Sequence, residues 1–280
     1  MTELLIVGGL TVDRFANGTS APGGSVLHAG LAAVEEGVRP TFLTVAGDEP
    51  EARTGLARLA DMGRLFHQPS PTTVTYRHDE SGPRRVLVFD AGSAPIDATT
   101  AKQVEAPGVA LLAPIADELA PSVVDEMRAA LRPRWTVMLI QGWLRRLVVG
   151  EPVHPLTLDA VSSAAWKTFG AADAVVVSTE DLAEAPEDPF AQAAALRERL
   201  GPGPVLVVTL GPQGYLLDDP SADRLVASVP RRVVEGVPMV GAGDTFGAAL
   251  ALHLARGDVP LAAADAATER VIRVLERRRS

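Results

Sequence analysis

The sequence contains no cysteine among its 280 residues. Disulfide bonds, iron–sulfur clusters, thiolate zinc sites and a cysteine nucleophile are therefore excluded. The chain also lacks a basic leader, and its first apolar run, residues 4–7, is far too short for a signal peptide or a membrane span. Aromatic residues are scarce, at 4%. These absences are compatible with the cytoplasmic location that we expect.

Positive charge is in deficit, because the formal net charge is −9. A negative surface disfavours nucleic acid and anionic membranes, so we expect neither as a partner. Apolar residues make up 47% of the chain, which is enough for a sizeable core and argues against global disorder.

Short apolar strands alternate with helical stretches along most of the chain. This alternation predicts an α/β fold with a mostly parallel sheet and helices on both faces, in a single domain over residues 1–280. The expected strands are residues 4–8, 41–45, 109–114, 135–140, 174–177 and 205–210, with a late hairpin from 215–217 and 225–229. The expected helices are residues 26–36, a stretch ending at 59, 122–131, a helix within 161–172, 189–200 and 260–279.

A second, smaller β-structure is expected from two parts of the chain. Asn17-Gly18 is a strong hairpin signal just after the first strand. Residues 72–78 and 84–89 form another expected hairpin, with its turn at 79–83. Their polar, alternating pattern indicates a sheet with one exposed face, so we expect a small lid from about residues 11–21 and 72–90.

The string Gly241-Ala242-Gly243-Asp244 opens a run of small and apolar residues that ends at Gly257. A glycine-rich turn that begins a helix presents free backbone N–H groups and the positive end of the helix dipole, which together bind anions such as phosphate. Asp244 has two interpretations there: a general base that deprotonates a substrate hydroxyl, or a helix N-cap.

The first strand is followed by further candidate ligand residues. Asp13 stands at the carboxyl edge of that strand, where open α/β sheets bind ligands, although it could equally be a turn residue. Gly23 and Gly24 either admit a ligand close to the backbone or form a plain turn. Ser25 is expected to cap the next helix, and His28 in its first turn is expected to be a polar lining or surface residue.

Several familiar catalytic motifs are absent. The third glycine after Gly241 and Gly243 is Gly247, one position too late for a dinucleotide-binding fingerprint. No Walker A string and no His-Glu-x-x-His pair occur, and Ser25 has Leu27 where a nucleophile elbow needs glycine.

The order of these signals resembles the ribokinase-like (PfkB) family of sugar, polyol and nucleoside kinases. The resemblance runs across nearly the whole chain. It is carried by the early Asp13, the Gly23-Gly24 pair and the hairpin with Thr72-Thr73, followed by the strings Thr209-Leu210-Gly211-Pro212-Gln213-Gly214 and Gly241-Ala242-Gly243-Asp244-Thr245-Phe246. It implies a Rossmann-like three-layer α/β/α sandwich with a small β lid, and transfer of the ATP γ-phosphoryl group to a hydroxyl with the help of Mg²⁺.

Carried over residue by residue, the resemblance implies a role for each matching position. Asp244 would be the base, with the anion hole formed by Gly241, Ala242 and Gly243. The nucleotide would be bordered by Ser178, Thr209, Gly211 and Gly214, and Asp181 would hold a magnesium-bound water. The acceptor would be bound by Asp13, Gly23, Gly24, His28 and Gln141.

The chain departs from the family pattern at several places. Pro238 and Met239 stand where Asp-Thr is usual, which weakens the case for a monovalent-cation site. Ser178 stands for the usual Asn, and His28 stands where many sugar kinases have Asn. The short hairpin after Asp13 implies a small lid, so we expect a monomer or a weak homodimer.

Three functions follow from these observations. The first is an ATP-dependent kinase of a small sugar or polyol, inositol-like compounds included. The second is a sugar- or nucleotide-binding regulator with weak or no catalysis, suggested by Pro238, Met239 and Ser178. The third is a nucleoside kinase, for which Trp143 and Phe15 are the only aromatic candidates near the expected pocket to stack a base.

Overall fold

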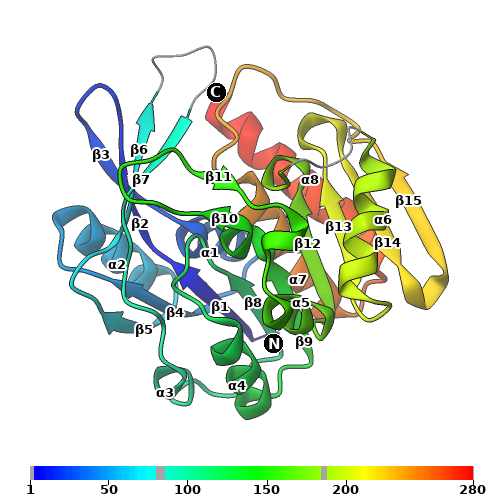
Figure 1. Cartoon of the computed structure of the whole chain (residues 1–280), viewed down its shortest axis with the longest axis horizontal. Coiled ribbons are helices and arrows are strands. Elements are labelled where there is room, and N and C mark those ends of the chain that lie inside the picture. The colour runs from blue at the N-terminus through cyan, green and yellow to red at the C-terminus, as the bar shows by residue number, and fades with distance from the viewer. Residues whose placement is uncertain (1–2, 80–85, 184–187, 280) are drawn as a thin grey trace.

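The computed structural model describes residues 3–79, 86–183 and 188–279. A nine-stranded sheet forms the middle layer, and helices cover both of its faces (Figure 1). Its strand order is β15-β14-β13-β12-β9-β8-β1-β4-β5. Every neighbouring pair is parallel except β13/β14 and β14/β15, so the predicted α/β class with a mostly parallel sheet is confirmed.

The strands of the large sheet are mostly five or six residues long. They are β1 (Leu4–Gly9), β4 (Thr41–Ala46), β5 (Arg64–Pro69), β8 (Val109–Ala113), β9 (Trp135–Leu139), β12 (Ala174–Ser178), β13 (Val205–Thr209), β14 (Tyr215–Asp219) and β15 (Arg224–Ser228). The strand β5 was not expected, because its sequence Arg-Leu-Phe-His-Gln-Pro is largely polar and suits only the half-exposed edge that it occupies.

Two helical layers bury alternate side chains of the strands. The helices α1 (Ser25–Glu35), α2 (Pro50–Met62), α7 (Ala242–Arg256) and α8 (Pro260–Arg279) pack on one face, and α3 (Ala98–Ala101), α4 (Pro121–Leu131), α5 (Ser163–Gly170) and α6 (Pro189–Leu200) pack on the other. In β1, Leu4 and Ile6 belong to the first core and Leu5 and Val7 to the second. This alternation is the period-two geometry of a strand buried on both faces.

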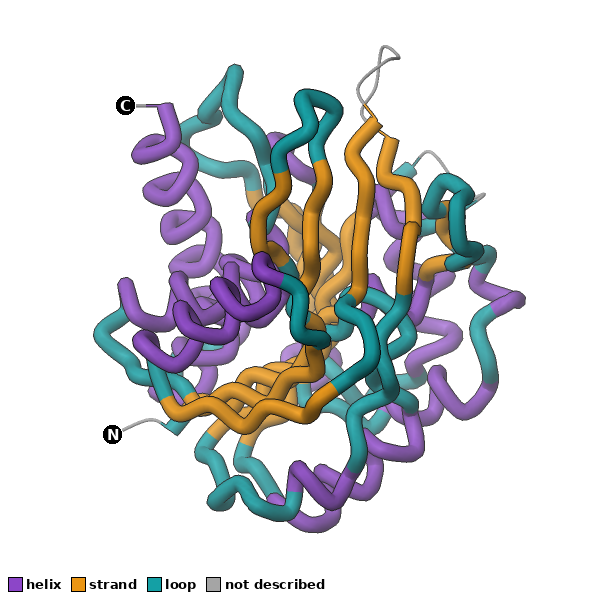
Figure 2. The backbone as a smooth tube through the Cα atoms, turned by 90° about the vertical axis from the view of Figure 1, so that its left-hand side faces the viewer, coloured by secondary structure: helices purple, strands orange, loops and turns teal. Residues whose placement is uncertain are grey.

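A separate four-stranded sheet stands beside the large one (Figure 2). Its order is β3-β2-β6-β7, with bounds β2 (Thr11–Arg14), β3 (Ser20–Gly23), β6 (Val74–Asp79) and β7 (Val86–Ala91). A short ribbon, β10 (Arg145–Arg146) with β11 (His154–Pro155), completes the strands among the described residues. The expected turn at residues 79–83 lies outside the described residues after Asp79.

Two local expectations were wrong. The polar residues of segment 72–78 were expected on an exposed face, but Thr73 and Thr75 are buried. The Thr73 hydroxyl donates to Glu49 and accepts from Gly47 N–H, and the Thr75 hydroxyl donates to the Thr73 carbonyl. Ser25 does not cap α1, whose N-cap is Gly24 with φ 97°. The Ser25 hydroxyl instead donates to the Ala113 carbonyl, which ties the start of α1 to the end of β8.

Candidate active site

The helix α7 begins at the glycine-rich string and is capped by Gly241 in the left-handed region, with φ 75°. Ala242 N–H donates to the Met239 carbonyl at 3.0 Å, and Thr245 N–H donates to the Gly241 carbonyl at 2.9 Å. By helix geometry the first-turn amides of Gly243 and Asp244 have no helical acceptor. The anion hole was expected from the amides of Gly241, Ala242 and Gly243. The Ala242 amide is instead used within the turn, and the amides left to bind an anion are those of Gly243 and Asp244.

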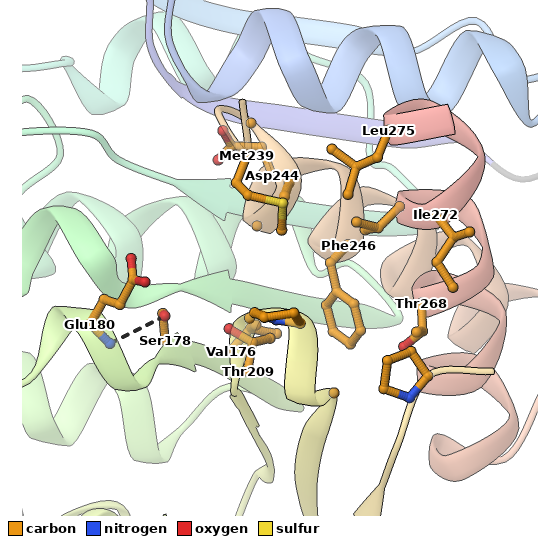
Figure 3. A pocket seen from close by; sticks show the side chains of 18 of the residues that line it. Val176, Ser178, Glu180, Thr209, Met239, Asp244, Phe246, Thr268, Ile272 and Leu275 are labelled. Carbon is orange, nitrogen blue, oxygen red and sulfur yellow. Dashed lines mark hydrogen bonds between the residues drawn. The ribbon is translucent and has the colours of Figure 1, made fainter. Parts of the chain in front are cut away.

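A cavity of about 350 Å³ opens at this helix terminus (Figure 3). It brings together every residue expected for catalysis and nucleotide binding, and Gln141 with them. These are Gln141, Ser178, Asp181, Thr209, Gly211, Gly214, Gly241, Ala242, Gly243 and Asp244. They come from four separate parts of the chain. Three lie at the carboxyl ends of β9, β12 and β13, and the fourth is the start of α7.

Asp244 is the buried acid of this cavity, with 6% of its surface exposed. It is the third residue of α7, and the cap position belongs to Gly241, so the N-cap interpretation of Asp244 is wrong. Burial raises the pKa of Asp244 from 3.8 to about 6, against the opposing charge of Arg145. A carboxylate with this pKa is ionised at neutral pH and basic enough to accept a proton.

Gln141 and Arg145 form a short relay to that acid. Both come from the turn η1 (Ile140–Leu144) and the residue after it, at the end of β9. Arg145 Nη2 donates to Gln141 Oε1 at 3.2 Å, and Gln141 Nε2 lies 3.5 Å from Asp244 Oδ1. Arg145 Nη1 also donates to the Ile115 carbonyl at 2.9 Å, which orients the guanidinium into the cavity.

Arg145 was not assigned a role from the sequence. Its spacing of four residues from Gln141 was the available signal, since that spacing allows two side chains to meet across one turn.

The other expected acceptor residues, Asp13, Gly23, Gly24 and His28, do not line the cavity and form a second group. Asp13 Oδ1 accepts from the Thr11 hydroxyl at 3.2 Å and lies 3.5 Å from His78 Nε2. A Cβ on Gly23 would lie 2.2 Å from Asp13 Oδ2, so a larger residue there would displace this carboxylate. Gly24 likewise admits no Cβ, which would lie 2.3 Å from the Gly9 carbonyl oxygen.

No sequence pattern indicates a role for His78. It is 3% exposed, and neither ring nitrogen has a hydrogen-bond partner in the described part of the chain. Its ring stacks on Phe15 with centroids 4.8 Å apart. The buried imidazole thus faces Asp13 through Nε2. Its position in β6 could not be paired with Asp13 without the strand register.

His28 connects the two groups. A Cβ on Gly241 would lie 2.3 Å from His28 Cγ, so the ring packs directly against the start of α7. Burial lowers the pKa of His28, the charge of Arg278 lowers it further, and Asp13 opposes both. The imidazole is therefore neutral at neutral pH, so one of its two ring nitrogens is a donor and the other is an acceptor.

The other walls of the cavity are turns and apolar side chains. In η3 (Thr179–Asp181), the Ser178 hydroxyl accepts from Glu180 N–H and Asp181 accepts from Ser178 N–H, which is a capping box. Across the cavity, α7 and α8 present an apolar wall that includes Phe246, Ile272 and Leu275 (Figure 3). The cavity thus has a polar floor and one apolar side.

No group of three or more histidine, aspartate or glutamate side chains that could hold a metal is found among the described residues. Glu180 and Asp181 line the cavity nevertheless, and burial raises the pKa of Asp181. Mg²⁺ commonly binds through one or two carboxylates together with waters and substrate phosphates. This sparse donor set fits an ion that arrives with a phosphate ligand.

Comparisons with known proteins find similar sequences among carbohydrate kinases. Residues 147–269 match the pfkB family carbohydrate kinase model. Ribokinase of Bacillus subtilis (strain 168) is 25% identical over 248 residues, covering 85% of this chain and 75% of that protein.

Two solved structures share the fold. A pyrophosphate-dependent kinase in the ribokinase family, complexed with a pyrophosphate analog and myo-inositol, has a TM-score of 0.75 at 17% identity, covering 95% of this chain and 92% of that one. Arabidopsis thaliana ribokinase complexed with ribose and ATP has a TM-score of 0.69 at 16% identity, covering 99% of each chain.

Proposed function

We propose that the chain, whose residues 147–269 match the pfkB family carbohydrate kinase model, is a ribokinase-like kinase that transfers the γ-phosphoryl group of ATP to a hydroxyl of a small sugar or polyol. The observation that carries the proposal is Asp244, a buried acid with a raised pKa in the first turn of α7. It lies in one cavity with free helix-terminal amides.

In the proposed reaction, Asp244 accepts the proton of the attacking hydroxyl. The amides of Gly243 and Asp244 donate to the transferring phosphoryl oxygens, and the dipole of α7 favours the charge that builds there. Arg145 adds a positive charge on the same cavity. Mg²⁺, held by phosphate oxygens and by Asp181 through water, would neutralise charge on the donor. We therefore expect positioning and charge stabilisation to supply most of the rate.

The lining of the cavity supports a nucleotide as the donor. Val176, Phe246, Ile272 and Leu275 give an apolar surface on which a base can pack, and a bare inorganic donor gains nothing from such a surface. Thr209, Gly211 and Gly214 would border the nucleotide together with Ser178, which pairs with Thr209 across β12 and β13.

On the acceptor side, we propose that Asp13 accepts hydrogen bonds from the hydroxyls of the substrate. Gly23 and Gly24 would allow the close approach, and His28 and Gln141 would bind further hydroxyls. Aromatic residues near this group are few, which favours a sugar or a polyol, inositol-like compounds included, over a nucleoside. The small sheet β3-β2-β6-β7 would act as the lid of a single kinase domain over residues 1–280.

None of the described helices is both long and apolar enough to cross a bilayer. We propose a cytoplasmic enzyme that acts as a monomer or a weak homodimer.

The test is turnover on a panel of sugars, polyols and nucleosides, with Mg²⁺ and either ATP or pyrophosphate as the donor. We expect ADP formation with at least one sugar or polyol, and a phosphate monoester in the ³¹P NMR spectrum of the product. Asp244→Asn should reduce that rate by about a hundredfold or more. Asp258→Asn is the matched control, because Asp258 lies beyond the far end of α7 and should leave the rate unchanged.

Two other results would change the proposed function or the proposed donor. ATP binding in a thermal-shift assay without turnover on any acceptor would favour the regulator. Turnover with pyrophosphate alone would reject ATP as the donor while keeping the acceptor chemistry.

A further inference from the structure

The segment that leads into α7 is held by the end of the last helix. Residues 229–241 connect β15 to α7 without a helix or strand of their own. Arg278, near the end of α8, donates from a single nitrogen, Nη1, to the Pro238 carbonyl at 2.9 Å and to the Val240 carbonyl at 2.7 Å. Figure 1 shows this end of α8 beside the segment.

The two carbonyls belong to the last residues before the helix cap. The carbonyl between them, that of Met239, accepts from Ala242 N–H. Three successive carbonyls are therefore engaged immediately before Gly241, two of them by a cationic donor. Hydrogen bonds from a charged donor are about twice as strong as neutral ones, so Arg278 is placed to hold the chain where it enters α7.

The positive charge of Arg278 faces the segment that leads into α7. Neighbouring Arg277 forms an ion pair with Glu35, whereas no carboxylate partner of Arg278 is found within the described ranges. The positive charge of Arg278 also disfavours protonation of His28, whose ring packs against Gly241. The field of this guanidinium thus reaches the start of α7.

The same segment is poorly built for a free inorganic cation. Residues 237–240 are Val, Pro, Met and Val, and none carries a side-chain oxygen. An alkali cation needs oxygen ligands on several sides, as carbonyl-lined sites provide. Here the convergent carbonyls are already held by a nitrogen of the chain itself.

We propose that Arg278 is a tethered cation: it occupies the position between the Pro238 and Val240 carbonyls, positions the first-turn amides of α7, and makes phosphoryl transfer independent of added monovalent cations. This inference rests on the proposed kinase function. Arg278 acts through the loop and is a positioning residue.

The first test compares rates in buffers whose only monovalent cation is tetramethylammonium, sodium or potassium. The unaltered protein should show rates within about twofold of one another. Arg278→Ala should lower kcat about tenfold or more with little change in the acceptor KM, and added guanidinium or potassium should restore part of the loss. Arg278→Lys should retain more of the rate than Arg278→Ala.

Arg279→Ala is the matched control, because it removes an equal charge from the adjacent position of α8. Its rate should equal that of the unaltered protein. A strict potassium requirement in the unaltered protein, or equal rates for Arg278→Ala and Arg279→Ala, would overturn the proposal.

A second test does not depend on turnover. Amide hydrogen exchange across residues 238–246 should be faster in Arg278→Ala than in the unaltered protein, and unchanged in Arg279→Ala. If no acceptor is phosphorylated, the kinase proposal fails, and this comparison still decides whether Arg278 holds the loop. Equal exchange in all three proteins would show that it does not.

Discussion

At the scale of single residues, Asp244 combines high burial with an ionised state at neutral pH. Its pKa rises from 3.8 in the unfolded chain to about 6 in the folded protein because burial disfavours the charge. Between these values the folded state binds a proton that the unfolded state does not, so stability falls as pH rises from about 4 to 6. The proposed base therefore costs stability at the pH where it acts.

This cost gives a prediction for Asp244→Asn. The amide is uncharged and can still accept from Gln141, so the variant should be more stable than the unaltered protein at pH 8, by at most about 3 kcal/mol. Thermal unfolding at pH 8 should show a rise of a few degrees that disappears near pH 4. A variant that is inactive and also less stable at pH 8 would contradict this account of Asp244.

A second prediction concerns Arg145, whose charge holds the pKa of Asp244 below the value that burial alone would set. Arg145→Gln should move the acidic limb of the kcat/KM profile to higher pH and lower the plateau by about tenfold or more. Arg145→Lys should keep the limb close to its original position. Arg146→Gln is the control, because Arg146 is exposed and lies outside the cavity lining; an unmoved limb in Arg145→Gln would remove the proposed electrostatic role.

At the scale of the element, the start of α7 contains two glycines that should tolerate change very differently. Gly241 has φ 75°, and a Cβ there would meet the His28 ring at 2.3 Å. Gly243 has ordinary helical φ, and a Cβ there meets nothing within 4 Å. Since Gly243 lines the cavity, that open space is the region proposed for the donor phosphate.

Gly241→Ala should therefore destabilise the fold by about 1–2 kcal/mol from the left-handed conformation alone, with the His28 contact adding to it. Gly243→Ala should keep or slightly raise the melting temperature and raise the KM for the donor several-fold. Thermal unfolding and donor kinetics on both variants measure this difference. Similar melting temperatures for the two variants would show that alanine at position 241 is not strained.

At the scale of the whole molecule, charged groups join the first helix to the last two. Glu36 follows α1 and accepts from Arg256 of α7 and from Arg270 of α8, and Glu35 pairs with Arg270 and Arg277. Burial raises the pKa of Glu36, but the hydrogen bonds from Arg256 and Arg270 outweigh it and leave the pKa below its usual value. This network fixes α7 against the helix that carries His28.

Because the folded pKa of Glu36 is depressed, its stabilisation is present above the unfolded value of 4.5 and is lost as pH falls through the folded pKa. Glu36→Gln should therefore lower stability at pH 7 by about 1–2 kcal/mol, with a smaller difference at pH 3. Thermal unfolding at both pH values checks this. An equal difference in stability at pH 7 and pH 3 would show that the loss comes from packing and not from the charge of Glu36.

Much of the architecture could be predicted from local patterns. The bounds of α6 and α8 and the start of the run that forms α7 agree with the expected ones, because caps, prolines and apolar periodicity act within a few residues. The motif string 241–244 and the turn 209–214 line one cavity. Only the turn directly follows a strand of the large sheet, so the place of the string depends on how α7 packs against that sheet.

What the sequence alone determined, then, is the α/β class, most strands of the large sheet and the place of the motif string 241–244 at the start of a helix. Only the tertiary structure decided which residues meet. Gln141 and Asp244 are 103 positions apart, His78 reaches Asp13 through strand register, and Arg278 reaches back 40 positions to Pro238. Such contacts depend on how the sheet and helices pack, and no short-range pattern records that packing.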